Sequence, residues 1–189
     1  MEARGRNTDK TRRMVLDAAA KVVGTQGAGA SVDTIARHAG VSKGGVLHHF
    51  KSRDQMLLAL AEDLIEQFRA AVHAAIDPHD NAPGRLVRGY VNATFDELVS
   101  GDGNSEFAVL VATLFSVPGV DELLRQDSRR WADAFDADGL HPQRARLIMH
   151  AADGASIAGL YGGGDLASLE QSRQLLLALS RQDGPLIAP

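Results

Sequence analysis

The chain has 189 residues, of which 44% are hydrophobic and 23% charged, and it contains no cysteine. This is the composition of an ordinary globular protein, so it excludes a disordered chain, a disulfide-stabilised scaffold and a cysteine nucleophile. The longest mostly apolar run, residues 109–117, is about half the roughly 18 residues of a membrane span, and no secretory signal pattern is found. We therefore expect a cytoplasmic protein without a membrane partner.

The charge is divided unevenly along the chain. The formal net charge is −4, but residues 1–54 carry ten Lys or Arg and five Asp or Glu, which gives +5. Residues 55–189 carry ten basic and nineteen acidic side chains, so their net charge is −9. Such asymmetry points to nucleic-acid or membrane contact by the basic part, although ordinary variation in solvated surface charge gives the same pattern.

Apolar residues recur at helical spacing throughout the chain, and no sustained alternating run predicts a strand. Together with capping residues and helix-breaking Gly and Pro residues, this spacing predicts nine helices. From the N-terminus, we expect them at about 9–26, 31–39, 42–49, 52–76, 83–100, 106–117, 119–136, 142–161 and 168–180. The predicted fold class is all-α, with helices packing on helices.

Polar residues mark several of the predicted helix starts. Ser31, Ser42 and Ser168 each precede a helical segment and are expected N-caps. Ser52, with Gln55 three residues later, has the spacing of a capping box.

The two short helices before residue 50, joined at Gly40, have the layout of a helix-turn-helix. Helices this short are not stable alone, so each must bury apolar residues against its neighbours. The residues available for this are Val32, Ile35, Ala36 and Ala39 on the first helix and Val46 and Phe50 on the second. In a helix-turn-helix, the second helix enters the major groove of DNA.

The segment from Ser31 to Asp54 reads SVDTIARHAGVSKGGVLHHFKSRD and resembles the N-terminal domain of the TetR family of transcriptional regulators. The resemblance runs from about Thr11 to Ala61. Its most specific parts are Ile35-Ala36, Ala39-Gly40-Val41, Ser42-Lys43-Gly44, His49-Phe50 and Ser52-Arg53-Asp54. It implies a homodimeric DNA-binding regulator, usually a repressor, that is released by a small molecule bound among the C-terminal helices.

On this basis we expect two functional domains. Residues 1–53 would form an N-terminal arm and a DNA-binding domain, with the helix-turn-helix at about 31–50. Residues 54–189 would form a helical domain for effector binding and dimerisation. The partners would be a palindromic operator in double-stranded DNA, a second copy of the chain and a small-molecule effector of unknown identity.

The expected DNA contacts follow the family's motif residue by residue. Lys43 can reach a phosphate or a guanine edge, and Gly44 allows close approach of the backbone. Gly45 and Leu47 depart from the family's pattern, which often has Thr or Asn at the first position and very often Tyr at the second. The full expected set is Ser31, Thr34, Ser42, Lys43, Gly44, Gly45, Leu47, His48, His49 and Lys51.

The basic arm at the start of the chain has two interpretations. It either reaches the minor groove or phosphates, as homeodomain-type arms do, or only aids solubility. Its basic residues are Arg4, Arg6, Lys10, Arg12 and Arg13.

Aromatic side chains are spread over several predicted helices of the second part. Each one fits an ordinary core, but together they could line an apolar cavity with a few polar groups, which would suit a lipophilic or aromatic effector. The residues expected there are Phe68, Asn92, Phe95, Phe107, Val111, Phe115, Trp131, Phe135, Met149, His150 and Asp153.

The last two predicted helices are apolar on more than one face, which is more than packing on one side requires. We expect an isologous four-helix interface between two subunits, formed by Ile148, Ala152, Ala155, Leu175, Leu176 and Leu179.

Catalytic motifs and cofactor-binding motifs are not found, so we expect no enzyme activity and no cofactor. His150 and Asp153 lie three residues apart, but two ligands do not make a metal site. Two alternatives remain: a regulator without a small-molecule ligand, acting as an activator or controlled by a protein partner, and a helical-bundle enzyme or carrier.

Overall fold

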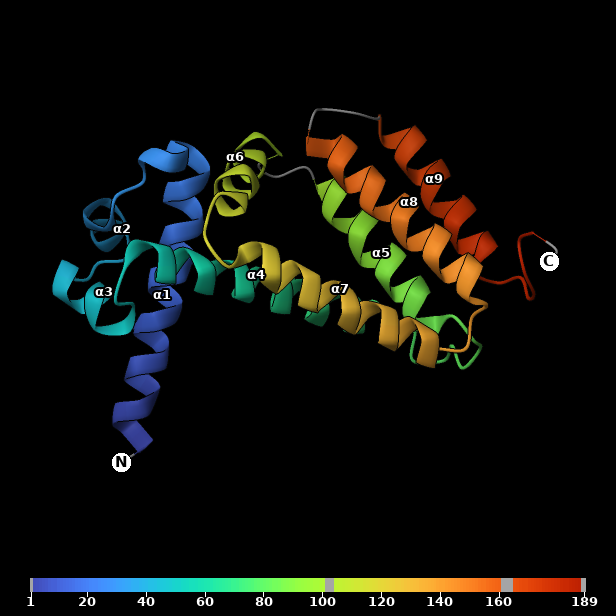
Figure 1. Ribbon diagram of the computed structural model, residues 1–189, viewed down its shortest axis with the longest axis horizontal. Coiled ribbons are helices and arrows are strands. Elements are labelled where there is room, and N and C mark those ends of the chain that lie inside the picture. Colours follow the sequence, from blue (N-terminus) through green and yellow to red (C-terminus); the bar gives the residue numbers. More distant parts are fainter. Residues whose placement is uncertain (1, 101–103, 161–164, 188–189) are drawn as a thin grey trace. The chain divides into compact units, whose positions relative to one another are not determined.

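The computed structural model describes residues 2–100, 104–160 and 165–187 (Figure 1). The described residues form nine α-helices and one short 3-10 helix, and no strand occurs among them, so the all-α prediction is confirmed. The helices are α1 (Glu2–Gln26), α2 (Val32–His38), α3 (Lys43–His49), α4 (Arg53–Ala74), α5 (Arg85–Ser100), α6 (Asn104–Phe115), α7 (Val120–Ala137), α8 (Pro142–Leu160) and α9 (Leu166–Leu179). The 3-10 helix η1 (Gly27–Gly29) follows α1. The predicted end of the eighth helix, Tyr161, lies outside the described residues.

The predicted N-caps at Ser31, Ser42 and Ser52 are confirmed. The hydroxyl group of each serine accepts a hydrogen bond from the backbone N–H three residues later, which belongs to Thr34, Gly45 and Gln55, respectively. The distances are 3.1, 3.0 and 3.1 Å. The capping box at α4 is displaced by one residue, because the Gln55 side chain accepts from Lys51 N rather than from the cap residue itself.

Four predicted helix starts differ from the structure. Helix α1 begins at Glu2, seven residues before the predicted start, so the basic arm lies within this helix, and α6 begins at Asn104, two residues before its predicted start. The N-cap of α9 is Asp165, whose carboxylate accepts from Ser168 N at 2.9 Å, so Ser168 belongs to the first turn. Helix α5 begins at Arg85, two residues after the predicted start, because Asp138 caps it from the end of α7. The Asp138 carboxylate accepts from Leu86 N at 2.9 Å and from Val87 N at 3.2 Å.

The chain divides into two compact units. The first contains residues 1–64 and 105–124, and the second contains residues 65–104 and 125–189. Helices α4 and α7 therefore each pass from one unit to the other. The functional division at residue 53 stays a prediction.

The first unit packs α1, α2 and α3 against one another around one apolar core. As predicted, the two short helices bury Ile35, Ala36, Ala39, Val46 and Phe50, each at most 6% exposed, while Val32 is half-buried. The surrounding core comes from α1, the first half of α4, and α6 with the residues that follow it, namely Val15, Leu16, Ala19, Val22, Val23, Met56, Leu57, Leu60, Leu110, Leu114, Val117 and Val120.

The second unit is organised around α5, which lies beside α8 and α9 (Figure 1). Helix α5 is buried on most sides, and its own core residues include Val87, Tyr90, Val91 and Phe95. The nearly buried Arg88 donates to both carboxylate oxygens of Asp80, at 2.5 and 2.8 Å, and to Ser180 O at 3.1 Å. Its guanidinium group therefore ties the end of α9 to the segment before α5.

Two glycines of the second unit allow helices to approach closely. A Cβ atom on Gly89 would lie 2.7 Å from Ile76 Cγ1 and 2.8 Å from Val72 O. A Cβ atom on Gly159 would lie 2.6 Å from Leu98 Cδ2. Packing against the backbone of α4 therefore accounts for glycine at position 89, whereas at position 159 only the end of the Leu98 side chain would have to move.

Replacing Gly89 with alanine is expected to lower the free energy of unfolding by about 1–3 kcal/mol, because the new methyl group would overlap a backbone oxygen that cannot move independently of α4. Urea denaturation followed by the fluorescence of Trp131, the single tryptophan, measures this change. Gly29→Ala is the control, because a Cβ atom there meets nothing within 4 Å, and it should change stability by less than about 0.5 kcal/mol. Equal stability of the two variants would contradict the close packing of α5 on α4.

Candidate nucleic-acid interface and effector site

The turn between α2 and α3 holds the two helices in a fixed relation. Gly40 has φ +68, in the left-handed region that glycine adopts without strain. The backbone N–H of Val41 donates to Ala36 O at 3.0 Å, and that of Gly40 donates to Arg37 O at 3.2 Å. This closes α2 and directs the chain into α3, as the predicted helix-turn-helix requires.

Helix α3 has a buried side and an exposed side. Val46 and the following Phe50 are at most 2% exposed and attach the helix to the first unit's core. Lys43, Gly44, Leu47 and His48 are exposed and share one face at helical spacing, while Gly45 and His49 are half-buried. The exposed side is therefore free to contact a ligand as large as DNA.

The two cap hydroxyls have part of their hydrogen-bonding capacity used within the chain. Ser42 Oγ accepts from Gly45 N, and Ser31 Oγ accepts from Thr34 N while lying 2.9 Å from Thr34 Oγ1. Because a hydroxyl group can donate as well as accept, both side chains, which are exposed, can still donate to a phosphate oxygen.

The two adjacent glycines of α3 differ in what surrounds them. A Cβ atom on Gly45 would lie 3.3 Å from Ser42 Oγ and 3.7 Å from Val41 Cβ, so the N-cap itself limits the side chain there. On Gly44, the same atom would meet only Ser42 Oγ, at 3.9 Å. In a helix interior, glycine lowers helix stability by about 1 kcal/mol relative to alanine. At Gly44, no described residue lies close enough to exclude a side chain.

An ion pair connects the two helices of the motif. Lys43 Nζ lies 2.9 Å from Asp33 Oδ2, and both side chains are more than half exposed. No local sequence pattern indicates this pair, because the two residues lie on different helices.

Two arginines of the basic arm have partners inside the first unit. The Arg12 guanidinium group lies 5.4 Å from the ring centroid of Phe50. Arg13 donates to both carboxylate oxygens of Asp63 on α4, at 2.8 Å each, and also binds Asp17. The side chains of Arg4 and Arg6 lie outside the described residues.

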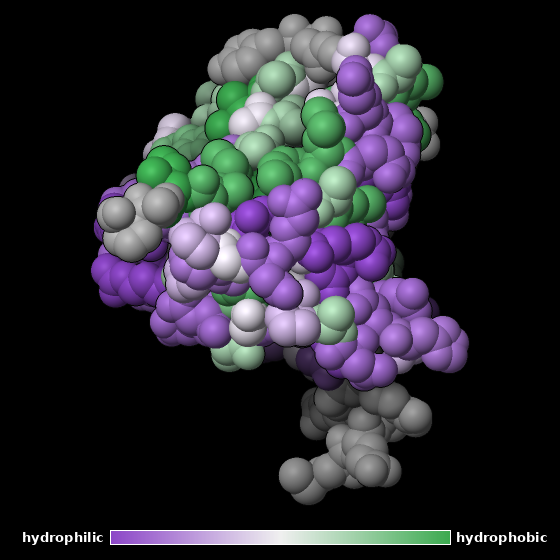
Figure 2. Space-filling view, turned by 90° about the vertical axis from the view of Figure 1, so that its right-hand side faces the viewer, coloured by the Kyte–Doolittle hydropathy of each residue, from purple (hydrophilic) through white to green (hydrophobic). Residues whose placement is uncertain are grey.

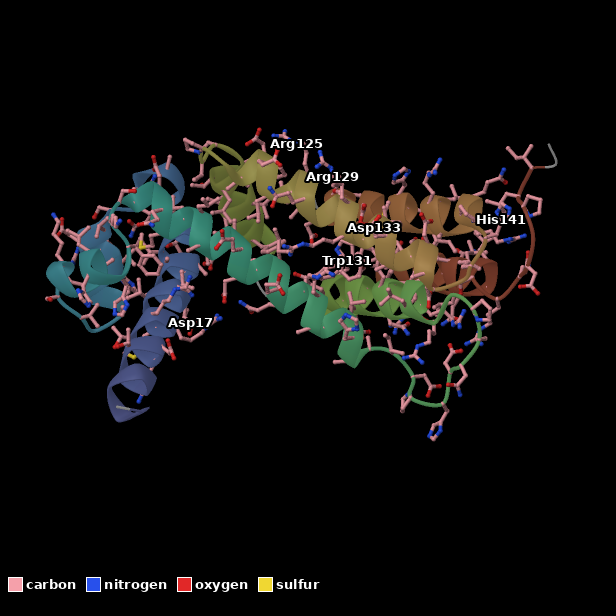
Figure 3. The ribbon with its side chains drawn as sticks, turned by 60° about the horizontal axis from the view of Figure 1, so that its bottom comes forward. Asp17, Arg125, Arg129, Trp131, Asp133 and His141 are labelled. Atoms are coloured by element: carbon pink, nitrogen blue, oxygen red, sulfur yellow. The ribbon has the colours of Figure 1, made fainter. Side chains whose placement is uncertain are left out.

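In the second unit, four aromatic side chains from three helices form one cluster. Phe68 of α4, Tyr90 of α5, and Trp131 and Phe135 of α7 lie with neighbouring ring centroids 5.1–6.2 Å apart. Figure 3 shows Trp131 on the side of α7 that faces the other helices, whereas Arg129 lies on its outer side. Three members of the predicted effector site are thus brought together.

A polar pair lies against this cluster. The Tyr90 hydroxyl donates to Asp153 Oδ1 of α8 at 2.5 Å. Burial, followed by this hydrogen bond and the nearby negative charge, raises the pKa of the Tyr90 phenol. Tyr90 lies at the centre of this cluster, although the predicted set omitted it. The Arg69 guanidinium group lies over the Trp131 ring, 4.5 Å from its centroid, and pairs with Asp127 at 2.9 Å.

The other predicted effector-site residues are distributed differently. Phe95 is fully buried in the same core as Tyr90, Trp131 and Phe135, which are at most 8% exposed. Met149 packs against that core, and His150 is exposed. Asn92 accepts two hydrogen bonds from Arg173 of α9, at 3.2 and 3.0 Å. The three predicted residues of α6 belong to the first unit, so the structure groups them with the helix-turn-helix and not with the aromatic cluster; they are Phe107, Val111 and Phe115.

The predicted dimer interface requires a correction. Ile148, Ala152 and Leu176 are at most 8% exposed and pack in the core of the second unit, so they form no surface that a second chain could cover. Ala155 and Leu179 are half-buried, and Leu175 is 60% exposed. Hydrophobicity alone did not distinguish the residues buried in the core of the second unit from those exposed on its surface.

Helices α8 and α9 do expose apolar residues, but mostly other ones. Leu147 and Ile157 of α8 and Leu166 of α9 are 47%, 59% and 64% exposed. Figure 2, which views the side that carries the C-terminal helices, shows hydrophobic residues gathered in one area of this surface. Exposed apolar area of this kind marks interaction sites.

The described residues also bear on metal binding and on membrane insertion. They contain no group of three or more His, Asp or Glu side chains placed to hold a metal ion. No single helix among them has the length and hydropathy to cross a membrane, although the bent pair of residues 105–115 and 120–137 passes that test by length and composition.

Comparison with known proteins covers both parts of the chain. Residues 15–60 match the family model "Bacterial regulatory proteins, tetR family", and residues 84–181 match "Tetracyclin repressor-like, C-terminal domain". The HTH-type transcriptional regulator BetI of Cronobacter sakazakii is 30% identical over 182 residues, which cover 90% of this chain and 89% of BetI.

Solved structures of related proteins agree with this. A TetR-family member from Streptomyces coelicolor, SCO1917, is 28% identical with a TM-score of 0.65, over 89% of this chain and 97% of that one. The multidrug binding protein EbrR, in complex with malachite green, is 29% identical with a TM-score of 0.63, over 89% and 96% of the two chains. The chain belongs to the TetR family of bacterial transcriptional regulators, which are DNA-binding helix-turn-helix proteins and not enzymes.

Proposed function

We propose that the chain is a homodimeric repressor in the cytoplasm, that α3 reads a palindromic operator, and that a small aromatic effector bound in the second unit releases the DNA. The observation that carries this proposal is the exposed face of α3, which presents Lys43 and Gly44. A Cβ atom on Gly44 would meet only Ser42 Oγ, at 3.9 Å. Residues 1–53 would supply the DNA-binding domain and residues 54–189 the effector and dimer functions.

DNA recognition is assigned to the exposed residues of the helix-turn-helix. Lys43 supplies charge and donors, and Gly44 lets the backbone approach DNA without an intervening side chain. Leu47 can contact a thymine methyl group, which is the apolar feature of the major groove. The contact set stays as predicted: Ser31, Thr34, Ser42, Lys43, Gly44, Gly45, Leu47, His48, His49 and Lys51.

Dimerisation is assigned to the exposed face of α8 with α9. A Cβ atom on Gly154, in the middle of α8, would meet nothing within 4 Å, in contrast to Gly89 and Gly159. Among the residues that the structure describes, none therefore requires glycine at this position, whereas a helix of a second copy crossing here would need it. Exposed apolar side chains surround it at helical spacing, and we include Leu147, Ala151, Ile157, Ala158 and Leu175 in the interface.

The effector is assigned to the aromatic cluster and the polar pair beside it. A mostly apolar site with one or two polar groups is typical of small-molecule binding, and a strongly perturbed ionisable group supports a functional role. The similarity to EbrR, whose complex contains an aromatic dye, favours the same class of ligand. Effector binding would shift the separation of the two α3 helices away from the 34–36 Å half-site spacing of about one DNA turn.

Lys43→Ala is expected to weaken DNA binding at least about tenfold, because the recognition helix loses its charged donor at the DNA surface. Fluorescence anisotropy with a duplex selected from random sequence by the wild-type protein measures the affinity. Lys21→Ala removes the same charge from an exposed position on α1 and should leave binding nearly unchanged. If both variants bind like wild type, α3 is not the recognition helix.

Gly154→Leu is expected to convert the dimer to a monomer while preserving the helical circular dichroism spectrum, because the side chain has open space within the chain. Sedimentation velocity distinguishes the two states. Ala132→Leu, at an exposed position of α7, adds apolar bulk elsewhere on the second unit and should leave the dimer intact. A dimer of unchanged stability in Gly154→Leu would place the interface on another surface.

Malachite green is expected to bind and to quench Trp131, since the aromatic cluster contains this residue. Asp153→Asn should weaken binding about tenfold or more, because the polar pair with Tyr90 loses its charge. Asp133→Asn removes a carboxylate that lies exposed on α7 and should have no effect (Figure 3). No binding, or equal affinity in wild type and Asp153→Asn, would contradict the proposed site.

A further inference from the structure

The ion pair between Lys43 and Asp33 lies at the DNA-facing end of the recognition helix. Lys43 is the first residue of α3, Asp33 lies in the first turn of α2, and the turn at Gly40 brings them within 2.9 Å. Their side chains are 56% and 59% exposed, so water and salt reach the pair freely. An exposed pair of this kind adds little to the stability of the fold, so its effect is to be sought in what Lys43 binds.

A lysine paired in this way differs from a free lysine in what it binds well. Phosphate affinity depends on the positive charge that displaces counterions, and the Asp33 carboxylate cancels that charge and repels the phosphate. Base recognition depends instead on hydrogen-bond donors. An ammonium group has three donors, so Lys43 keeps two for the neutral O6 and N7 acceptors of guanine while the third remains on Asp33.

We propose that Asp33 is a specificity-determining residue, which lowers the contribution of Lys43 to sequence-independent phosphate binding and reserves its donors for a base edge. This inference rests on the proposed role of Lys43 in DNA contact. Asp33 acts as a positioning residue and need not touch DNA.

Asp54 provides a matched control for Asp33. It is an aspartate in the first turn of α4, as Asp33 is in the first turn of α2, and its side chain is 62% exposed. Its partner is Arg53, at 4.0 Å, and not Lys43. Asp54→Asn therefore makes the same change in net charge and in the interaction with a helix N-terminus without releasing Lys43.

The experiment measures binding of the full-length protein to a duplex of random sequence at several salt concentrations. In Asp33→Asn, Lys43 becomes free to neutralise a phosphate, so the slope of log K against log salt should steepen by about 0.9 for each recognition helix bound. When the salt concentration is lowered from about 200 to about 50 mM, the ratio of the variant's affinity to the wild-type affinity should therefore increase about 3.5-fold for each helix. Affinity for the duplex selected by the wild-type protein should rise less, so the specificity ratio should fall.

The Lys43→Ala background separates a positioning effect from a simple charge effect. There, Asp33→Asn should leave the salt slope unchanged, and Asp54→Asn should leave it unchanged in either background. The inference is overturned if Asp33→Asn has the same effect with and without Lys43, if Asp54→Asn matches it, or if the slope does not change. If Lys43→Ala itself leaves DNA binding intact, the assignment of the recognition helix fails as well, so the two failures are distinguishable.

Discussion

The proposed recognition surface depends on the burial of two helices that are too short to be stable alone. Helices α2 and α3 have seven residues each, about half the length at which an isolated helix becomes even marginal. Their stability comes from Ile35, Val46 and Phe50, which are at most 2% exposed in a core shared with α1, α4 and α6. These buried side chains turn one face of each helix toward the core. Lys43 lies on the opposite face of α3 and is therefore exposed. Any change that loosens this core therefore also changes the DNA-binding surface.

The glycines inside helices differ in whether neighbouring residues of the chain leave space for a side chain. A Cβ atom on Gly89 would lie 2.8 Å from a backbone oxygen of α4, so packing within the chain explains glycine there. Gly44 and Gly154 have nothing closer than 3.9 Å. One lies on the exposed face of the recognition helix and the other among the exposed apolar residues of α8. We attribute both to surfaces outside the chain, DNA in one case and a second copy of the chain in the other.

Local features were predictable from the sequence, and contacts between distant residues were not. The helix-turn-helix, its serine caps and its buried residues follow from spacing within a few residues. The cap on α5 comes from Asp138, 52 residues after the N–H group of Leu86 that it binds, and no local pattern indicates it. Likewise, Ile148 and Leu175 are both apolar residues of C-terminal helices, but only the structure shows that the first is in the core and the second is exposed. Asp165 and Ser168 are both good capping residues, and the choice between them depends on the backbone where α9 begins.

Central to the proposed function is that two copies of the chain present two α3 helices to one face of DNA. Hydroxyl-radical footprinting of the wild-type protein on its selected duplex tests this most directly. The account predicts two protected patches related by two-fold symmetry, with centres about 10 base pairs or a multiple of one helical turn apart. A single protected patch, with one chain bound per duplex, would contradict it.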